Sequence, residues 1–170
     1  MSLENNVLSI VHAMAFPGPG NTNSVLRSEA DEKYLIASLR KIVDDPYFGG
    51  IEVTHIKDRR HRAAAAKLLA EARDGSMVVT FVCQPVQLIN EENLIDPADL
   101  SAADDNEREK AVARILELLE EAVELGADRL TLLSGRDPAY GITDATRAAE
   151  VREMGTVGLV RSLDLSLIHI

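Results

Sequence analysis

The chain has 170 residues, of which 46% are hydrophobic and 27% charged, a composition typical of a globular protein with one hydrophobic core rather than of a disordered chain. Its formal net charge of −10 repels a phosphate backbone, so we expect no nucleic acid among its partners. One cysteine, Cys83, excludes an internal disulfide, and no run approaches the ~18 apolar residues of a membrane span. We therefore expect a soluble, cytoplasmic protein.

Short apolar runs alternate along the chain with segments of helical periodicity. The strongest helical pattern lies at 106–127, where we expect an apolar stripe to be buried and Gly126 to end the helix. That stripe consists of Val112, Ile115, Leu119, Ala122 and Val123. The predicted elements are a strand at 7–16, a helix at 31–43, a strand at 51–56, a helix at 59–73, a strand at 77–83, a helix at 106–127, a strand at 129–135 and a helix at 146–163.

Four strands that alternate with four helices predict parallel βα units, and therefore the α/β class. Two architectures fit this order, an open doubly wound sheet and the first four units of a (β/α)8 TIM barrel. The loop after the first strand, PGPGNTNS, lacks the third glycine of GxGxxG and has no P-loop lysine, which favours the barrel. In both architectures the functional residues lie at the carboxyl ends of the strands.

The first two strands carry candidate site residues. His12 shares alternate positions with apolar residues, so it is either a hydrogen-bonded core histidine or a ligand contact. We expect His55 to reach the mouth of the sheet, where an imidazole can bind substrate or handle a proton; the alternative is a capping role. Alternation directs Glu52 away from the helices, either as a buried hydrogen-bond acceptor or as a polar wall of the site.

Polar residues also follow the third and fourth strands. Gln84 offers an amide that can bind sugar hydroxyls without burying a charge. Ser134 precedes a glycine that allows close approach of a ligand, and Arg136 either holds a phosphate or carboxylate or forms a surface turn with Asp137. The predicted substrate-binding set is His55, Gln84, Glu52, Ser134, Arg136 and His12. No residue is assigned as catalytic or as a metal ligand.

A resemblance to a known family rests on four motifs in a fixed order. They are GGIEVTHIKD, VTFVCQP, AVARILELLEEAVELGADRL and LLSGRDP. Over residues 7–160 the chain resembles the xylose-isomerase-like TIM-barrel superfamily, which holds sugar-phosphate isomerases and epimerases together with metal-dependent apurinic endonucleases. The resemblance implies a barrel that binds a sugar or sugar phosphate and uses a divalent metal (Mn, Mg, Co or Zn) to move a proton alpha to a carbonyl.

The chain departs from this family in its length. A full barrel needs about 250 residues, and the metal ligands of the family come from later strands. The resemblance therefore implies a partial barrel over residues 1–163, with four βα units, no metal site and no activity as it stands. Residues 164–170 resemble a translated cloning adapter, and the alternative is a short native fifth strand.

Three functions remain open. The first is a metal-dependent sugar or sugar-phosphate isomerase or epimerase, represented by its N-terminal half. The second is a non-catalytic half-barrel that binds a partner or associates with itself, because an isolated half exposes sheet edges and apolar helix faces. The third is an apurinic endonuclease on the same barrel, which the charge of −10 disfavours.

Overall fold

The computed structural model describes residues 7–16, 32–56, 58–83, 99–135 and 137–168. The chain divides into two compact units. The first consists of residues 1–85 and 120–131, and the second of residues 86–119 and 132–170.

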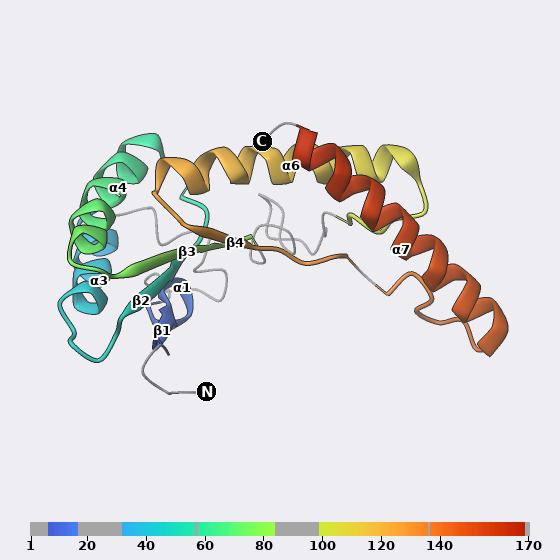
Figure 1. Cartoon of the computed structure of the whole chain (residues 1–170), viewed down its shortest axis with the longest axis horizontal. Helices are drawn as coiled ribbons and strands as arrows, with labels where there is room; N and C mark the ends of the chain where they lie inside the picture. Colours follow the sequence, from blue (N-terminus) through green and yellow to red (C-terminus); the bar gives the residue numbers. More distant parts are fainter. Residues whose placement is uncertain (1–6, 17–31, 57, 84–98, 136, 169–170) are drawn as a thin grey trace. The chain divides into compact units, whose positions relative to one another are not determined.

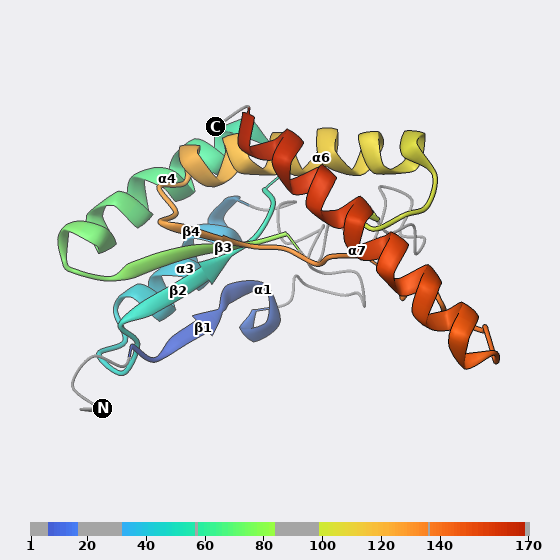
Figure 2. The same ribbon diagram turned by 45° about the vertical axis from the view of Figure 1, so that its right-hand side comes forward.

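The first unit contains a four-stranded sheet in the order β1-β2-β3-β4 (Figures 1 and 2). Its strands are β1 (Ser9–Val11), β2 (Gly50–Val53), β3 (Val78–Val82) and β4 (Arg129–Thr131). All neighbouring pairs are parallel, so the chain crosses back to the same end of the sheet after each strand. The protein is mixed α/β, and the class predicted from the alternation of strands and helices is confirmed.

Helices α3 (Glu32–Val43) and α4 (Arg59–Asp74) lie in two of these crossovers and pack side by side (Figure 1). The apolar positions predicted for them are buried: Leu35, Leu39 and Ile42 in α3, and Ala65, Leu68, Leu69 and Ala72 in α4. Asp58 caps α4, because its carboxylate accepts a 2.8 Å hydrogen bond from the backbone N–H of Arg60. Hydrogen bonds from the Arg60 side chain and backbone lower the pKa of Asp58 to about 2.

The sheet has an apolar face and a polar face, as the alternation in β2 predicts. Ile51 and Phe81 lie on the apolar face and are fully buried. On the other face Glu52, Thr80 and Arg129 align in one row across β2, β3 and β4. The Thr80 hydroxyl donates to Oε2 of Glu52 over 3.4 Å, so the row begins with a hydrogen-bonded pair.

Helix α6 (Asp105–Glu124) buries a different stripe from the predicted one near its carboxyl end. The prediction for Val123 is wrong, because this side chain is 75% exposed, whereas Glu121 is only 2% exposed. Leu118 and Leu125 are buried three residues before and four residues after Glu121, so the buried face of the helix runs through the carboxylate. The helix ends as predicted at a glycine with positive φ.

That glycine, Gly126, has a φ of +71° and closes the helix with a 2.9 Å hydrogen bond from Ala127 N–H to the Ala122 carbonyl. A Cβ at this position would lie 2.8 Å from Nη1 of Arg73. Arg73 in turn pairs with Asp128, which immediately precedes β4. The turn therefore fixes the short connection between α6 and β4.

In the second unit, α7 (Ala145–Ile168) packs through small residues. Ala148, Gly155 and Ser162 lie seven residues apart on one face and are buried. The Ser162 hydroxyl donates to the Leu100 carbonyl over 2.9 Å, and a Cβ on Gly155 would come within 2.7 Å of Pro138. Small side chains thus allow the helix to approach its neighbours closely.

Several boundaries differ from the prediction, and three of the differences change an element. The first apolar run is a strand only over β1 and then turns into the short helix α1 (His12–Ala15), whose two alanines favour helix. The strand predicted at 129–135 ends with β4 at Thr131. Helix α7 continues through residues 164–168, so the alternative of a fifth strand there is wrong.

Candidate functional site

A buried histidine–carboxylate pair lies just beyond the carboxyl end of β2. Nδ1 of His55 is 2.6 Å from Oε2 of Glu121 in the last turn of α6, and the two side chains are 12% and 3% exposed. Because an ionised carboxylate can only accept, Nδ1 is the donor. In the neutral ring the lone pair is then on Nε2, for which the described residues offer no hydrogen-bond partner.

The carboxylate of Glu121 has one further hydrogen-bond donor and one ion-pair partner. The backbone N–H of Ile56 donates to Oε1 over 2.5 Å, and Nη2 of Arg62 lies 3.3 Å from Oε2. A buried charge is costly unless it is paired and hydrogen-bonded, and this one meets both conditions. Glu121 therefore joins the segment after β2 to the first turns of α4.

Arg62 extends the cluster on both sides. Its Nε and Nη2 donate to the Ile56 carbonyl over 3.1 and 2.9 Å, and its Nη1 donates to Glu124 over 2.9 Å. Its side chain is 13% exposed. The guanidinium thus contacts both the backbone beside His55 and the carboxylate of Glu121, which in turn orients the His55 ring.

The resulting arrangement is that of an oriented base. Glu121 fixes the tautomer and direction of the His55 ring and would stabilise the imidazolium formed when Nε2 takes a proton. His55 is among the residues predicted from the sequence, whereas Glu121 and Arg62 are not. The available signal for Glu121 was its place between Leu118 and Leu125 on one helical face.

His12 lies in a different environment from His55. It is 4% exposed, and its Nε2 is 2.8 Å from the hydroxyl of Ser38, which itself donates to the Leu35 carbonyl over 2.9 Å. Nε2–H is therefore the donor, and burial lowers the pKa of His12 to about 4. These contacts are those of a neutral core histidine.

The other predicted site residues lie in three different settings. Glu52 is half-buried on the polar face of the sheet, where it accepts from Thr80. Ser134 is exposed and belongs to the second unit. Gln84 and Arg136 lie outside the described residues, so their assignment to the site stays a prediction.

The surface turn predicted around Asp137 has an ion pair of its own. The carboxylate of Asp137 lies 2.8 Å from Nη2 of Arg152 in α7, and the hydrogen bonds from Arg152 lower the pKa of Asp137. Its carboxylate therefore has a charged partner within the same unit.

Among the described residues, no three His, Cys, Asp or Glu side chains are grouped closely enough to hold a metal ion. The His55–Glu121 pair supplies two such side chains, whereas a zinc site takes at least three protein ligands. The resemblance places the ligands of its divalent metal on later strands, so that metal stays a prediction for the complete protein.

We expect Glu121→Gln to lower the free energy of unfolding by about 2–4 kcal/mol, because it leaves Arg62 and His55 facing a neutral amide in a buried site. Urea denaturation at pH 7 measures the change. Glu124→Gln is the matched control, since it removes an exposed carboxylate from the same arginine and should cost less than about 1 kcal/mol. Equal losses in the two variants would contradict a special role for Glu121.

His12 should make stability depend on pH. Its folded pKa of about 4 lies below the ordinary histidine value of 6.5, so the unfolded chain binds more protons between these two values. The stability due to the neutral ring is complete above pH 6.5 and falls by up to ~3 kcal/mol as the pH drops to 4.

Urea denaturation of the wild type and of His12→Gln, at pH 7 and about pH 4.5, tests this. The amide of glutamine can place a donor where Nε2 lies beside Ser38 but does not titrate, so the variant should lose less stability on acidification than the wild type. The same loss in both proteins would exclude His12 as its source.

No protein-family model and no curated protein matches the chain. Among the described residues, no helix combines the length and apolar character needed to cross a membrane.

Proposed function

We propose that this chain forms four βα units of a (β/α)8 barrel from a sugar or sugar-phosphate isomerase or epimerase, which in its complete form moves a proton alpha to a carbonyl. The observation that carries the proposal is the His55 ring after β2, with Nδ1 bound to buried Glu121 and Nε2 left for a ligand. A histidine oriented by a carboxylate is suited to accept a proton or a hydroxyl hydrogen bond.

The strand order supports the barrel. In a doubly wound sheet the order reverses at a switch point and helices cover both faces. Here β1 to β4 follow the sequence, and α3 and α4 pack side by side (Figure 2). In a closed barrel the polar row Glu52, Thr80 and Arg129 would face the interior, and the fully buried Ile51 and Phe81 would lie beneath the helices.

A sugar or sugar phosphate is the proposed ligand. We assign hydroxyl contacts to Gln84 and Ser134, and a phosphate contact to Arg136. The acidic chain repels extended polyanions, so a phosphate group needs a local arginine. His12 supports the site from the core and does not contact the ligand through Nε2, because that nitrogen already donates to Ser38.

In the complete barrel, His55 takes the proton, and two other residues of this chain, Glu121 and Arg62, position its ring. When Nε2 of His55 takes a proton from the substrate, the ring becomes a cation whose Nδ1 lies 2.6 Å from the Glu121 carboxylate. That carboxylate stabilises the cation electrostatically, and Arg62 keeps it in place. The divalent metal, whose ligands the resemblance places on later strands, would polarise the carbonyl and stabilise the enediolate in the complete barrel.

A second candidate is a non-catalytic half-barrel that associates with itself. The observation in its favour is that β1 pairs only with β2, and β4 only with β3, within the described residues. Unpaired edges of a sheet can pair with strands of another chain. An apurinic endonuclease remains disfavoured by the net charge of −10.

Ligand binding by the 170-residue chain tests the substrate assignment. We expect one class among ketoses, aldoses and their phosphates to shift the NMR signals of the His55 ring saturably, most strongly at Nε2, and His55→Gln to weaken binding at least about tenfold. His61→Gln, which alters a histidine of α4 outside the cluster, should bind like the wild type. Absence of saturable shifts across the panel would leave the half-barrel candidate.

Catalysis by the complete barrel should appear as exchange of a substrate C–H proton with solvent deuterium. We expect His55→Gln to lower kcat/KM by roughly 10²–10⁴-fold, the range for loss of a general acid or base, and Gln84→Ala to lower it as well. The 170-residue chain alone should show no exchange. A wild-type kcat/KM in His55→Gln would remove the imidazole from the site.

A further inference from the structure

Helix α7 exposes its larger apolar side chains. Met154 is 64% exposed and Val157 is 47% exposed, whereas Ala148, Gly155 and Ser162 occupy the buried face. This distribution is the reverse of that expected for a helix whose only contacts lie within its own domain. The exposed side of α7 therefore has features of an interface.

The exposed residues on this side form a regular line, which we call the α7 stripe. It consists of Arg147, Glu150, Met154, Val157, Arg161 and Asp164, all of which are exposed. Their spacing alternates between three and four residues, as along the contact seam of two helices in a coiled coil. The stripe covers about five turns of the helix.

The order of charges along the α7 stripe is self-complementary. It reads positive, negative, apolar, apolar, positive, negative. If two copies of α7 lie antiparallel about a two-fold axis midway between Met154 and Val157, each Glu150 faces Arg161 of the second copy, and Met154 packs on Val157. The outer residues, Arg147 and Asp164, then also meet with opposite charge. A parallel pair would instead place each charge opposite its own copy, which is unfavourable.

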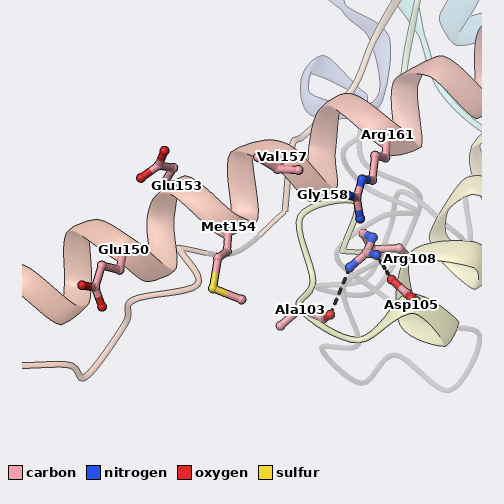
Figure 3. Close-up of a pocket in the computed structure, with 9 residues that line it drawn as sticks. All are labelled: Ala103, Asp105, Arg108, Glu150, Glu153, Met154, Val157, Gly158 and Arg161. Carbon is pink, nitrogen blue, oxygen red and sulfur yellow. Dashed lines mark hydrogen bonds and ion pairs between the residues drawn. The ribbon is translucent and has the colours of Figure 1, made fainter.

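A hollow runs along this side of the helix. Glu150, Met154, Val157 and Arg161 line a cavity of about 620 Å³ together with residues that include Arg108 (Figure 3). Figure 3 shows the side chains of Glu150, Met154 and Arg161 on one side of α7. The surface thus presents an open groove along the stripe rather than a closed core.

The charged groups of the groove differ in whether they have partners. Arg108 is held by the Ala102 carbonyl at 2.6 Å and by the carboxylate of Asp105. The side chains of Glu150 and Arg161, in contrast, form no ion pair or hydrogen bond with any residue that the structure describes. Both therefore remain available to a second molecule.

We propose that the α7 stripe is the interface of an antiparallel homodimer, with α7 of a second copy as the occupant of the groove. The charge order argues for this partner, because the stripe complements itself at all positions when the second helix runs in the opposite direction. The four central residues precede position 164, so the pairing does not require the segment 164–170. The inference is also independent of the proposed enzymatic function.

Sedimentation equilibrium of the full chain tests the dimer. We expect a dissociation constant of roughly 10–100 μM, because a five-turn helix pair buries less area than a standard stable interface. Glu150→Arg and Arg161→Glu should each weaken self-association at least about tenfold, since each turns two attractive pairs into repulsive ones. The double variant, which exchanges the two charges, should dimerise like the wild type.

Mixing the two single variants is the most specific arm of the test. The arginine introduced by Glu150→Arg then faces the glutamate introduced by Arg161→Glu, and the unchanged Arg161 of the first variant faces the unchanged Glu150 of the second. Both pairs are attractive, so heterodimers should form although neither variant dimerises alone. Glu109→Arg and Lys110→Glu make the same charge changes on exposed positions of α6 and should leave association unchanged. Circular dichroism checks that all variants are folded.

Three outcomes would overturn the proposal. They are a wild type that stays monomeric up to millimolar concentration, single variants that dimerise like the wild type, and single variants that fail to form heterodimers on mixing. Dimerisation unaffected by either charge reversal would assign self-association to another surface, such as the edges of the sheet.

Discussion

In the first unit, the structure of the segment that follows β2 depends on the buried carboxylate of Glu121. A charge on a side chain only 3% exposed must be matched by partners, which are hydrogen-bond donors from the His55 ring and the Ile56 backbone and the cation of Arg62. The carboxylate therefore fixes the turn between β2 and α4 against the last turn of α6. A ring held in this way loses little freedom when it meets a ligand, which is the physical basis for assigning His55 to a binding site.

Apolar periodicity was sufficient to predict α3 and α4, because their buried positions repeat at helical spacing without a polar interruption. In α6, apolar periodicity predicted that Val123 is buried and that Glu121 is not, because it assumes that charged side chains face water. A carboxylate with several donors can occupy a buried position instead. The position of Glu121 between Leu118 and Leu125 on one helical face was apparent in the sequence. Its pairing with a histidine 66 residues away was not, because that contact depends on how α6 returns to the sheet.

The two strand-end histidines show what a sequence position leaves undecided. Both His12 and His55 follow short strands, and the alternation of side chains does not distinguish a core residue from a site residue. The hydroxyl of Ser38 uses Nε2 of His12 and leaves a neutral ring whose pKa falls to about 4 on burial. The carboxylate of Glu121 uses Nδ1 of His55, and the described residues offer Nε2 no hydrogen-bond partner. The partner, which comes from a distant segment, determines which histidine keeps a ring nitrogen open to a ligand.

In helix α7, apolar periodicity does not indicate which face is buried. Its apolar residues lie on several sides, so the helix appeared weak by periodicity, yet small residues such as Gly155 and Ser162 bury one face through close backbone approach and hydrogen bonding. Once that face is assigned, the larger apolar residues on the exposed side need a separate physical explanation. The order of charges around Met154 and Val157 supplies one, because it distinguishes antiparallel from parallel pairing. A hydropathy average discards this order. A helix can therefore be weakly amphipathic and still have two faces with definite roles.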